Sequence, residues 1–200
     1  TAAMAQAISR NADAGGLLRK MFRNHYFVER RGDGEAFYQY HDLFREFLLA
    51  RFEESRTPAA ARATKRKAAQ ILEAGGHIEA AIDLLLSAQE TRAAVRLLLR
   101  VGQELIDQGR HQRVAAWLAE LPKESVAVNA WLSYWLGTTQ LPSDAPLAER
   151  SFEHCYESFG KTNDDIGCLF AAQGVVLAIT AQVGRFRRLE GADVRGIHAQ

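Results

Sequence analysis

The segment 37–48 constrains the fold most, because a strand-like pattern passes directly into a helix-like pattern there. Phe37-Tyr38-Gln39-Tyr40 is a short run of aromatic residues, which is typical of a β-strand. Asp42 suits the first turn of a helix, because a carboxylate stabilises the unpaired N–H groups at that end. Apolar residues then recur at steps of three or four and form two neighbouring rows, which predict a helix with a broad buried face: Leu43, Phe47 and Ala50, and Phe44, Leu48 and Phe52.

The preceding residues predict a helix and a β-hairpin. Residues 1–14 are rich in alanine, and we expect Gly15-Gly16 to end that stretch before a short helix over residues 17–22. Two β-prone runs, 26–28 and 37–40, flank Arg31-Gly32-Asp33-Gly34, whose glycines suit a tight turn. The order helix, hairpin, helix matches the second half of a winged-helix fold. We therefore expect a partial winged-helix-like module at residues 1–56.

The pattern changes at Thr57-Pro58, a pair that suits the start of a helix. Turn residues recur with a period of 33, at Gly76, Gly109 and Pro142. A period of about 34 residues is the length of a tetratricopeptide repeat, which is a helical hairpin. We expect residues 57–200 to form an α-α superhelix of such TPR-like hairpins, so that the fold class is mainly α. The expected helices cover residues 59–74, 78–88, 91–108, 112–121, 126–140, 146–159 and 164–182.

Composition excludes several classes of partner. The 25 basic and 24 acidic residues give a net charge of +1, which provides no long-range attraction for nucleic acid or for an anionic membrane. Cys155 and Cys168 cannot form a disulfide framework, which favours a reducing compartment. We find no signal peptide and no stretch near the roughly 18 apolar residues that span a bilayer. The expected location is cytoplasmic, without a membrane partner.

Catalytic and metal-binding patterns are weak. Gly160-Lys161-Thr162 resembles the end of a phosphate-binding loop, but Cys155 stands where that motif needs a glycine, and a helix pattern precedes it. The six histidines show neither metal-ligand spacing nor a cysteine partner. Asp164-Asp165 lies where a helix begins, a position that acids favour. We therefore predict no catalytic, cofactor or metal residue in this chain and expect no enzyme activity from it.

Three elements together resemble one family. They are the stretch 37–48, the pair Ala68-Ala69 with Gly75-Gly76 and Glu79-Ala80-Ala81-Ile82, and Trp117-Leu118-Ala119-Glu120-Leu121-Pro122. These segments and their spacing resemble bacterial signal-transducing NTPases with numerous domains, such as regulators of the maltose-regulon-activator type and large ATP-binding LuxR-type transcription regulators. The resemblance covers about residues 15–140. Gln39 and Asp42 depart from the family pattern, which favours a basic residue and a second histidine there.

The resemblance implies a regulatory role for an internal fragment. In that family an ATPase domain lies upstream and a DNA-binding helix-turn-helix lies downstream, so ATP is expected as the cofactor of the full-length protein. The winged-helix part contacts the nucleotide-binding domain, and the helical repeats bind a small-molecule inducer or an inhibitory protein. By this resemblance we expect the contact residues to be Tyr38, Tyr40, His41, Phe44 and Arg45.

Two other functions stay open from the sequence alone. A stand-alone helical-repeat scaffold would present a concave surface to a protein or peptide, but it would not need the aromatic segment 37–48. Direct DNA binding through the winged helix is disfavoured by the balanced charge. The basic residues that could touch phosphates are Arg19, Lys20, Arg23, Arg30 and Arg31.

Overall fold

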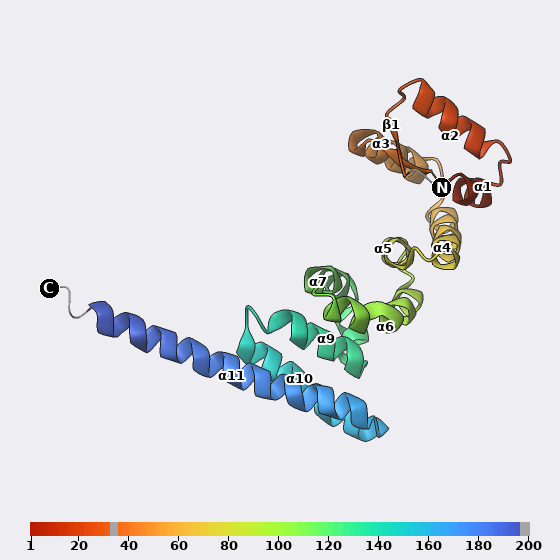
Figure 1. The fold of residues 1–200 in the computed structure, drawn as a ribbon. Helices are drawn as coiled ribbons and strands as arrows, with labels where there is room; N and C mark the ends of the chain where they lie inside the picture. The colour runs from red at the N-terminus through yellow and green to blue at the C-terminus, as the bar shows by residue number, and fades with distance from the viewer. Residues whose placement is uncertain (33–35, 197–200) are drawn as a thin grey trace. The chain divides into compact units, whose positions relative to one another are not determined.

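The computed structural model describes residues 1–32 and 36–196, and of residues 184–196 it describes the helical backbone. The chain is mostly helical with one antiparallel β-hairpin near its start, as predicted for the fold class (Figure 1). It divides into two compact units, Thr1–Ala94 and Val95–Gln200. The helix α6, Thr91–Asp107, contains the boundary between them. The predicted boundary at residues 56 and 57 stays a prediction.

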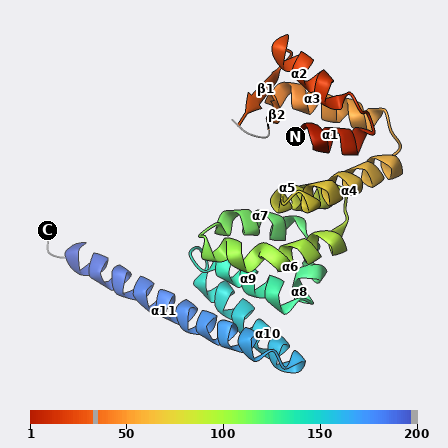
Figure 2. The ribbon, with the colours of Figure 1, turned by 45° about the vertical axis from the view of Figure 1, so that its right-hand side comes forward.

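The first unit contains the hairpin and the helices on either side of it. The predicted start of a helix at Thr57-Pro58 is confirmed, because Thr57 Oγ1 accepts a hydrogen bond from the Ala60 N–H at 3.3 Å. The unit's elements are α1 Ala2–Ser9, α2 Ala14–Arg23, β1 Val28–Arg31, β2 Phe37–Tyr40, α3 Asp42–Glu54, α4 Pro58–Ala74 and α5 Ile78–Ser87. Figure 2 shows the same elements from a second direction.

The prediction that Gly15-Gly16 separates two segments is wrong, because both glycines lie inside α2. Gly15 is buried where α1 packs on α2, and a Cβ atom added there would lie 3.2 Å from the Cβ of Ala2. The glycine therefore permits a close approach of two helices. Of the alanine-rich stretch 1–14, residues 2–9 form α1, and Ala14 already belongs to α2.

The hairpin has the predicted position. Val28 pairs with Tyr40 and Arg30 with Tyr38 in an antiparallel register, and Val28 is buried. Gly32 has the positive φ, 91°, that a glycine in a turn supplies readily. Asp33 and Gly34 of the predicted turn lie outside the described residues. The first strand covers Val28–Arg31 and not residues 26–28, so Arg31 of the predicted turn belongs to the strand.

The prediction of a broad buried face on α3 is wrong, because none of its residues is buried. Leu43 is 76% exposed and Phe47 is 57% exposed. The apolar rows exist on the helix, but in the described part of the first unit nothing covers the Leu43 row. Periodicity identifies an amphipathic helix but does not say which element covers its apolar face.

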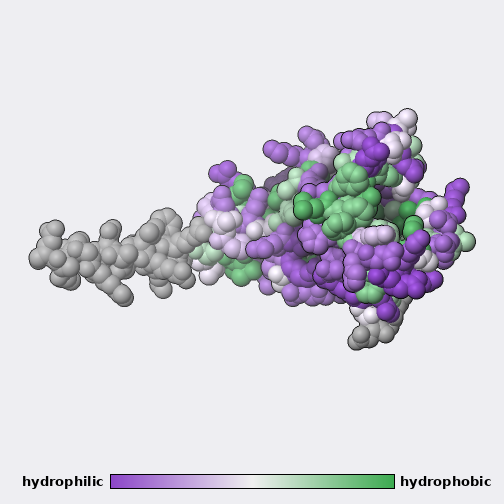
Figure 3. Space-filling model, turned by 90° about the horizontal axis from the view of Figure 1, so that it is seen from above, coloured by the Kyte–Doolittle hydropathy of each residue, from purple (hydrophilic) through white to green (hydrophobic). Residues whose placement is uncertain are grey.

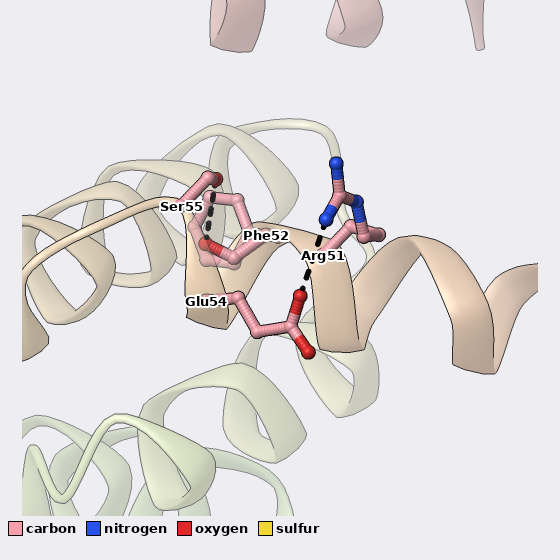
Figure 4. A network of polar contacts seen from close by, with 4 residues as sticks. All are labelled: Arg51, Phe52, Glu54 and Ser55. Carbon is pink, nitrogen blue, oxygen red and sulfur yellow. Dashed lines mark hydrogen bonds and ion pairs between the residues drawn. The ribbon is translucent and has the colours of Figure 1, made fainter.

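The C-terminal end of α3 is attached to α4 by side chains. Lys65 Nζ lies 3.0 Å from Glu53 Oε1. Arg56, in the connection between the two helices, lies 5.0 Å from the centre of the Phe52 ring and donates to the Thr64 hydroxyl of α4 at 3.4 Å. Within α3, Arg51 bonds to Glu54 at 3.4 Å, and the hydroxyl that follows the helix donates to the Phe52 carbonyl (Figure 4). The contacts with α4 hold one end of α3 in place.

In the second unit, helices pack side by side around aromatic residues. After α6 come α7 His111–Glu120, α8 Lys123–Ala127, α9 Ala130–Gln140, α10 Ala145–Thr162 and α11 Asp165–Gly196. The helices α9, α10 and α11 contact one another, and α7 contacts α9. The largest buried side chains are Trp117, Trp135, Phe152 and Phe159.

Three side-chain hydrogen bonds of this unit join distant segments of the chain. The indole N–H of Trp131 donates to Asp164 Oδ2 at 3.2 Å, and that of Trp135 donates to Gln103 Oε1 at 3.1 Å. The amide of Gln182 donates to Glu149 at 2.6 Å. The paired residues stand 33, 32 and 33 positions apart, which is close to the spacing of the turn residues.

Several predicted helix limits in this unit are wrong. The helix predicted over residues 126–140 is two helices, α8 and α9, because Asn129 caps α9 by accepting from the Leu132 N–H at 3.2 Å. Gly160 does not end α10; that helix continues to Thr162, and Asn163 caps it in the left-handed conformation with φ 54°. The last helix does not stop at Gly184 but continues to Gly196.

The predicted repeat has mixed support. Gly76 and Gly109 share the same backbone conformation, with φ 78° and 76°, as expected for equivalent turns after helices. The third turn differs, because Leu141, just before Pro142, has the right-handed φ of −49°. The assignment of TPR-like hairpins stays a prediction.

The last helix corrects the expectation about membrane-spanning segments. Its part Asp165–Val183 is long and apolar enough to cross a bilayer by length and composition alone. The same helix packs on α10 and contributes buried Ala171 and Ala178 to that contact. The segment is 22% buried and so is not a typical core helix, but one helix of this kind is by itself weak evidence for a membrane.

Candidate interdomain contact surface

Four aromatic rings form a cluster at the junction of the hairpin and α3. We call Phe27, Tyr40, Phe44 and Phe47 the aromatic cluster. The centre of the Phe44 ring lies 5.6 Å from that of Phe27, 5.7 Å from that of Tyr40 and 6.3 Å from that of Phe47. These distances are in the range at which aromatic pairs attract one another. Phe44 is therefore the centre of the cluster.

The outer members of the cluster are exposed. Phe27 is 64% exposed and Phe47 is 57% exposed, and Leu43, which precedes Phe47 by one turn of α3, is 76% exposed. Figure 3 shows hydrophobic residues gathered on the surface in the region of α3 and the hairpin. Contiguous exposed apolar groups on a folded protein mark interaction sites. Phe27, Leu43 and Phe47 form what we call the α3 surface.

The backbone at Phe27 is unusual. Its φ is 55°, a left-handed conformation that is an outlier for a bulky residue. The carbonyl of Phe27 accepts from the His41 N–H at 2.8 Å, which extends the hairpin by one bond. Such conformations cost about 1–3 kcal/mol and concentrate at functional sites. The conformation places an exposed phenyl ring beside α3.

The structure brings two of the five predicted contact residues together in the cluster. Tyr40 and Phe44 are half-buried members of it, and burial raises the pKa of the Tyr40 hydroxyl. His41 and Arg45 are exposed at the start of α3; His41 precedes the helix without a capping bond from its side chain. Tyr38 lies elsewhere, in a hollow of about 460 Å³ that α2 also lines.

That hollow collects some of the basic residues considered for DNA contact. Arg19, Arg23 and Arg30 line it together with Tyr38. Arg31 is instead paired with Glu29, at 3.1 Å. The arrangement gives a small basic hollow, and direct DNA binding stays untested.

Sequence reasoning missed Phe27, Leu43 and Phe47 as candidates. The spacing of Leu43 and Phe47 was visible but indicated burial. Phe27 belongs to a β-prone run, and no sequence pattern predicts a left-handed backbone conformation at a phenylalanine. The available signal was the density of large apolar residues in segment 37–48.

The comparison with known families concerns the same region. Residues 1–61 match the family model of the MalT winged helix domain. No curated protein and no solved structure matches the chain significantly. The matched part contains the aromatic cluster and all five predicted contact residues. It supports the identification of the chain as a segment of a MalT-like regulator.

Proposed function

We propose that this chain is the regulatory segment of an ATP-dependent bacterial transcription regulator, located in the cytoplasm. In this proposal the α3 surface contacts the nucleotide-binding domain of the same protein. The observation that carries it is the coincidence of two features: residues 1–61 match the MalT winged helix domain, and an exposed aromatic surface lies within that match.

The energetics favour a protein contact on the α3 surface. Burying a side chain the size of Leu or Phe stabilises an interface by about 1.5–3 kcal/mol. Leu43 and Phe47 project from α3, whose C-terminal end is attached to α4. A helix that is already ordered loses little conformational entropy when a partner docks on it.

The remaining parts of the proposal follow the family resemblance. ATP would be bound by the nucleotide-binding domain, and DNA by a helix-turn-helix domain. The helical region after Pro58 would bind a small-molecule inducer or an inhibitory protein. Such a ligand changes the balance between resting and active states only if it binds them unequally. This segment itself would carry no catalytic group.

The test combines two substitutions on the α3 surface, Leu43→Ser and Phe47→Ser. The chain and the nucleotide-binding domain encoded by the same gene would be produced separately, and their association measured by calorimetry. We expect the double variant to bind at least about tenfold more weakly, which corresponds to 1.4 kcal/mol. In the full-length protein, the same variant should change the ATP dependence of transcription from a reporter.

A matched control is available on the opposite side of α3. Leu49 is also exposed, but it lies about 200° around the helix from Phe47. Leu49→Ser should leave the association unchanged. Equal binding by wild type and the double variant would exclude the α3 surface as the contact. It would favour the alternative of a stand-alone helical-repeat scaffold, for which the α3 surface is dispensable.

A further inference from the structure

The second unit contains a cavity of about 680 Å³ among α7, α8, α9 and α10. This volume lies within the range of about 300–1,000 Å³ that is typical of small-molecule sites. The cavity lies outside the region that matches the family model. Its residues come from four helices of a single unit, so its walls are held by the packing of that unit.

The wall of the cavity is mainly apolar. Leu118, Leu121 and Val126 are buried side chains that face it, and Leu136 adds a further apolar group. The buried hydroxyl of Ser133 is not available to a ligand as a donor, because it donates to the Val126 carbonyl at 2.9 Å. The apolar body of a ligand would therefore gain mostly hydrophobic contact here.

The ionisable side chains that line the cavity are Lys123, Arg150 and His154, all of them basic. Neither Lys123 nor Arg150 has an ion-pair partner among the described residues. The acid next to Arg150, Glu149, is not among the lining residues and accepts instead from Gln182. All three basic side chains are exposed, so the positive charge lies at the mouth.

The neutral polar groups that line the cavity have partners within the protein. The Ser151 hydroxyl lies 3.2 Å from Gln140 Oε1 and 3.1 Å from the Leu147 carbonyl, so its single proton is donated to a protein oxygen. His154 Nε2 lies 3.3 Å from the Ala127 carbonyl, so this nitrogen donates within the protein and not to a ligand. The preference for an anion therefore comes from the charged donors Lys123 and Arg150.

We propose that this cavity binds a small amphipathic anion, with an apolar body against Leu118, Leu121 and Val126 and a carboxylate-like head between Lys123 and Arg150. In the regulator proposed above, such a molecule would be the chemical class of the inducer. The assignment of this ligand as the inducer rests on the proposed function. The binding site itself does not, because it involves none of the residues of the α3 surface.

The experiment uses the whole 200-residue chain and three probes with the same tail: decanoate, decanol and the decyltrimethylammonium ion. The two ions are titrated below their micellar concentrations and decanol below its solubility limit, and amide chemical shifts are followed by NMR. We expect saturable shifts confined to α7–α10 and an affinity for decanoate about tenfold above that for the other two. Equal affinities, or shifts confined to other helices, would overturn the proposal.

Variants separate the charged mouth from the apolar wall. Lys123→Gln combined with Arg150→Gln should lower the decanoate affinity about fivefold, because two exposed charges contribute modestly, and should leave decanol binding unchanged. Ala119→Trp, on the cavity wall, should block both probes. Lys161→Gln is the matched control, because Lys161 lies on the same helix as Arg150 but outside the cavity. Unchanged decanoate binding in the Lys123 and Arg150 variant would also overturn the proposal.

A failure of this site is distinguishable from a failure of the proposed function. Loss of the predicted decanoate binding would leave the association of the α3 surface with a nucleotide-binding domain untouched. Conversely, the chain could bind decanoate but fail to associate with that domain. The cavity would then still be a binding site, but its proposed role in regulation would be excluded.

Discussion

Gly102 lies directly against the indole ring of Trp135: a Cβ atom added at Gly102 would lie 2.5 Å from Cζ3 of that ring. The indole N–H of Trp135 also bonds to Gln103, the next residue of α6. The two contacts fix the approach of α6 and α9 in the second unit. Because Trp135 is almost fully buried, its ring has little room to move away.

Gly102→Ala should therefore destabilise the chain. The added methyl group overpacks a filled interior, which costs about 1–3 kcal/mol. The measurement is urea unfolding followed by tryptophan fluorescence. Gly160→Ala is the matched control: Gly160 lies inside α10 with open space around its Cα, so the higher helix propensity of alanine should stabilise by about 0.5–1 kcal/mol. Equal effects of the two variants would contradict the described packing.

Asp164 should be important for the stability of α11. Its carboxylate accepts from the Trp131 indole at 3.2 Å and from the Gly167 N–H at 2.9 Å. Asp164→Ala removes both bonds and should cost about 1–2 kcal/mol, as the loss of a helix cap does. Asp165→Ala, one residue later and exposed, should change the free energy of unfolding by less than about 0.5 kcal/mol. Similar losses in both variants would exclude the specific role of Asp164.

Phe44 should contribute more to the stability of the first unit than its exposed neighbour does. Phe44→Ala removes ring contacts with Phe27, Tyr40 and Phe47 and should cost about 1–3 kcal/mol. Phe47→Ala removes one of these contacts from an exposed position and should cost less than about 1 kcal/mol. Thermal unfolding followed by circular dichroism compares them. A larger loss in the Phe47 variant would show that the cluster is centred elsewhere.

The thiol of Cys155 should be unreactive in the folded chain. Burial raises its pKa to about 12, so the thiolate that reacts with disulfide reagents is scarce. An aromatic disulfide reagent at pH 8 should modify Cys168, which is half-buried, well before Cys155. In Cys168→Ser, modification should require unfolding. Fast modification of folded Cys168→Ser would contradict the burial of Cys155.

The same shift predicts a pH dependence of stability. The folded state keeps the Cys155 proton to higher pH than the unfolded state does, because the folded pKa is about 12 and the ordinary value is 9.0. The stabilising contribution is therefore complete below pH 9 and is lost as the pH rises from 9 toward 12. Cys155→Ala should flatten the fall of the free energy of unfolding over that range. If the substitution leaves the pH dependence of the free energy of unfolding unchanged, groups other than Cys155 cause the loss of stability.

The sequence allowed much of the helical pattern to be predicted, because turn residues are local signals. Gly76 and Gly109 end helices where expected, and Thr57 caps α4. The failures came from glycines inside helices. Gly15 lies in α2, where it permits close packing against α1, whereas Gly160 lies in α10 with open space around it, so a rule that ends helices at glycine fails for both. The spacing of apolar residues also did not predict that the row of Leu43, Phe47 and Ala50 on α3 is exposed.

The candidate sites were predictable only in part. Segment 37–48 drew attention to Tyr40 and Phe44, because it combines a strand with an aromatic helix. The left-handed Phe27 and the cavity lined by Lys123 and Arg150 depend on tertiary structure. The two basic residues stand 27 positions apart, on helices whose packing the periodicity did not specify. A single sequence does not show which side chains, distant along the chain, lie close together in the fold.

The hydrogen bonds that span 32 or 33 positions have a consequence for how this protein can vary. One inserted residue within a helix rotates everything beyond it by about 100° around the helix axis. The indole of Trp131 would then point away from Asp164, and the hydrogen bond would be lost although both residues are still present. An insertion or deletion inside one of these helices would therefore break a bond that a substitution on an exposed face leaves intact.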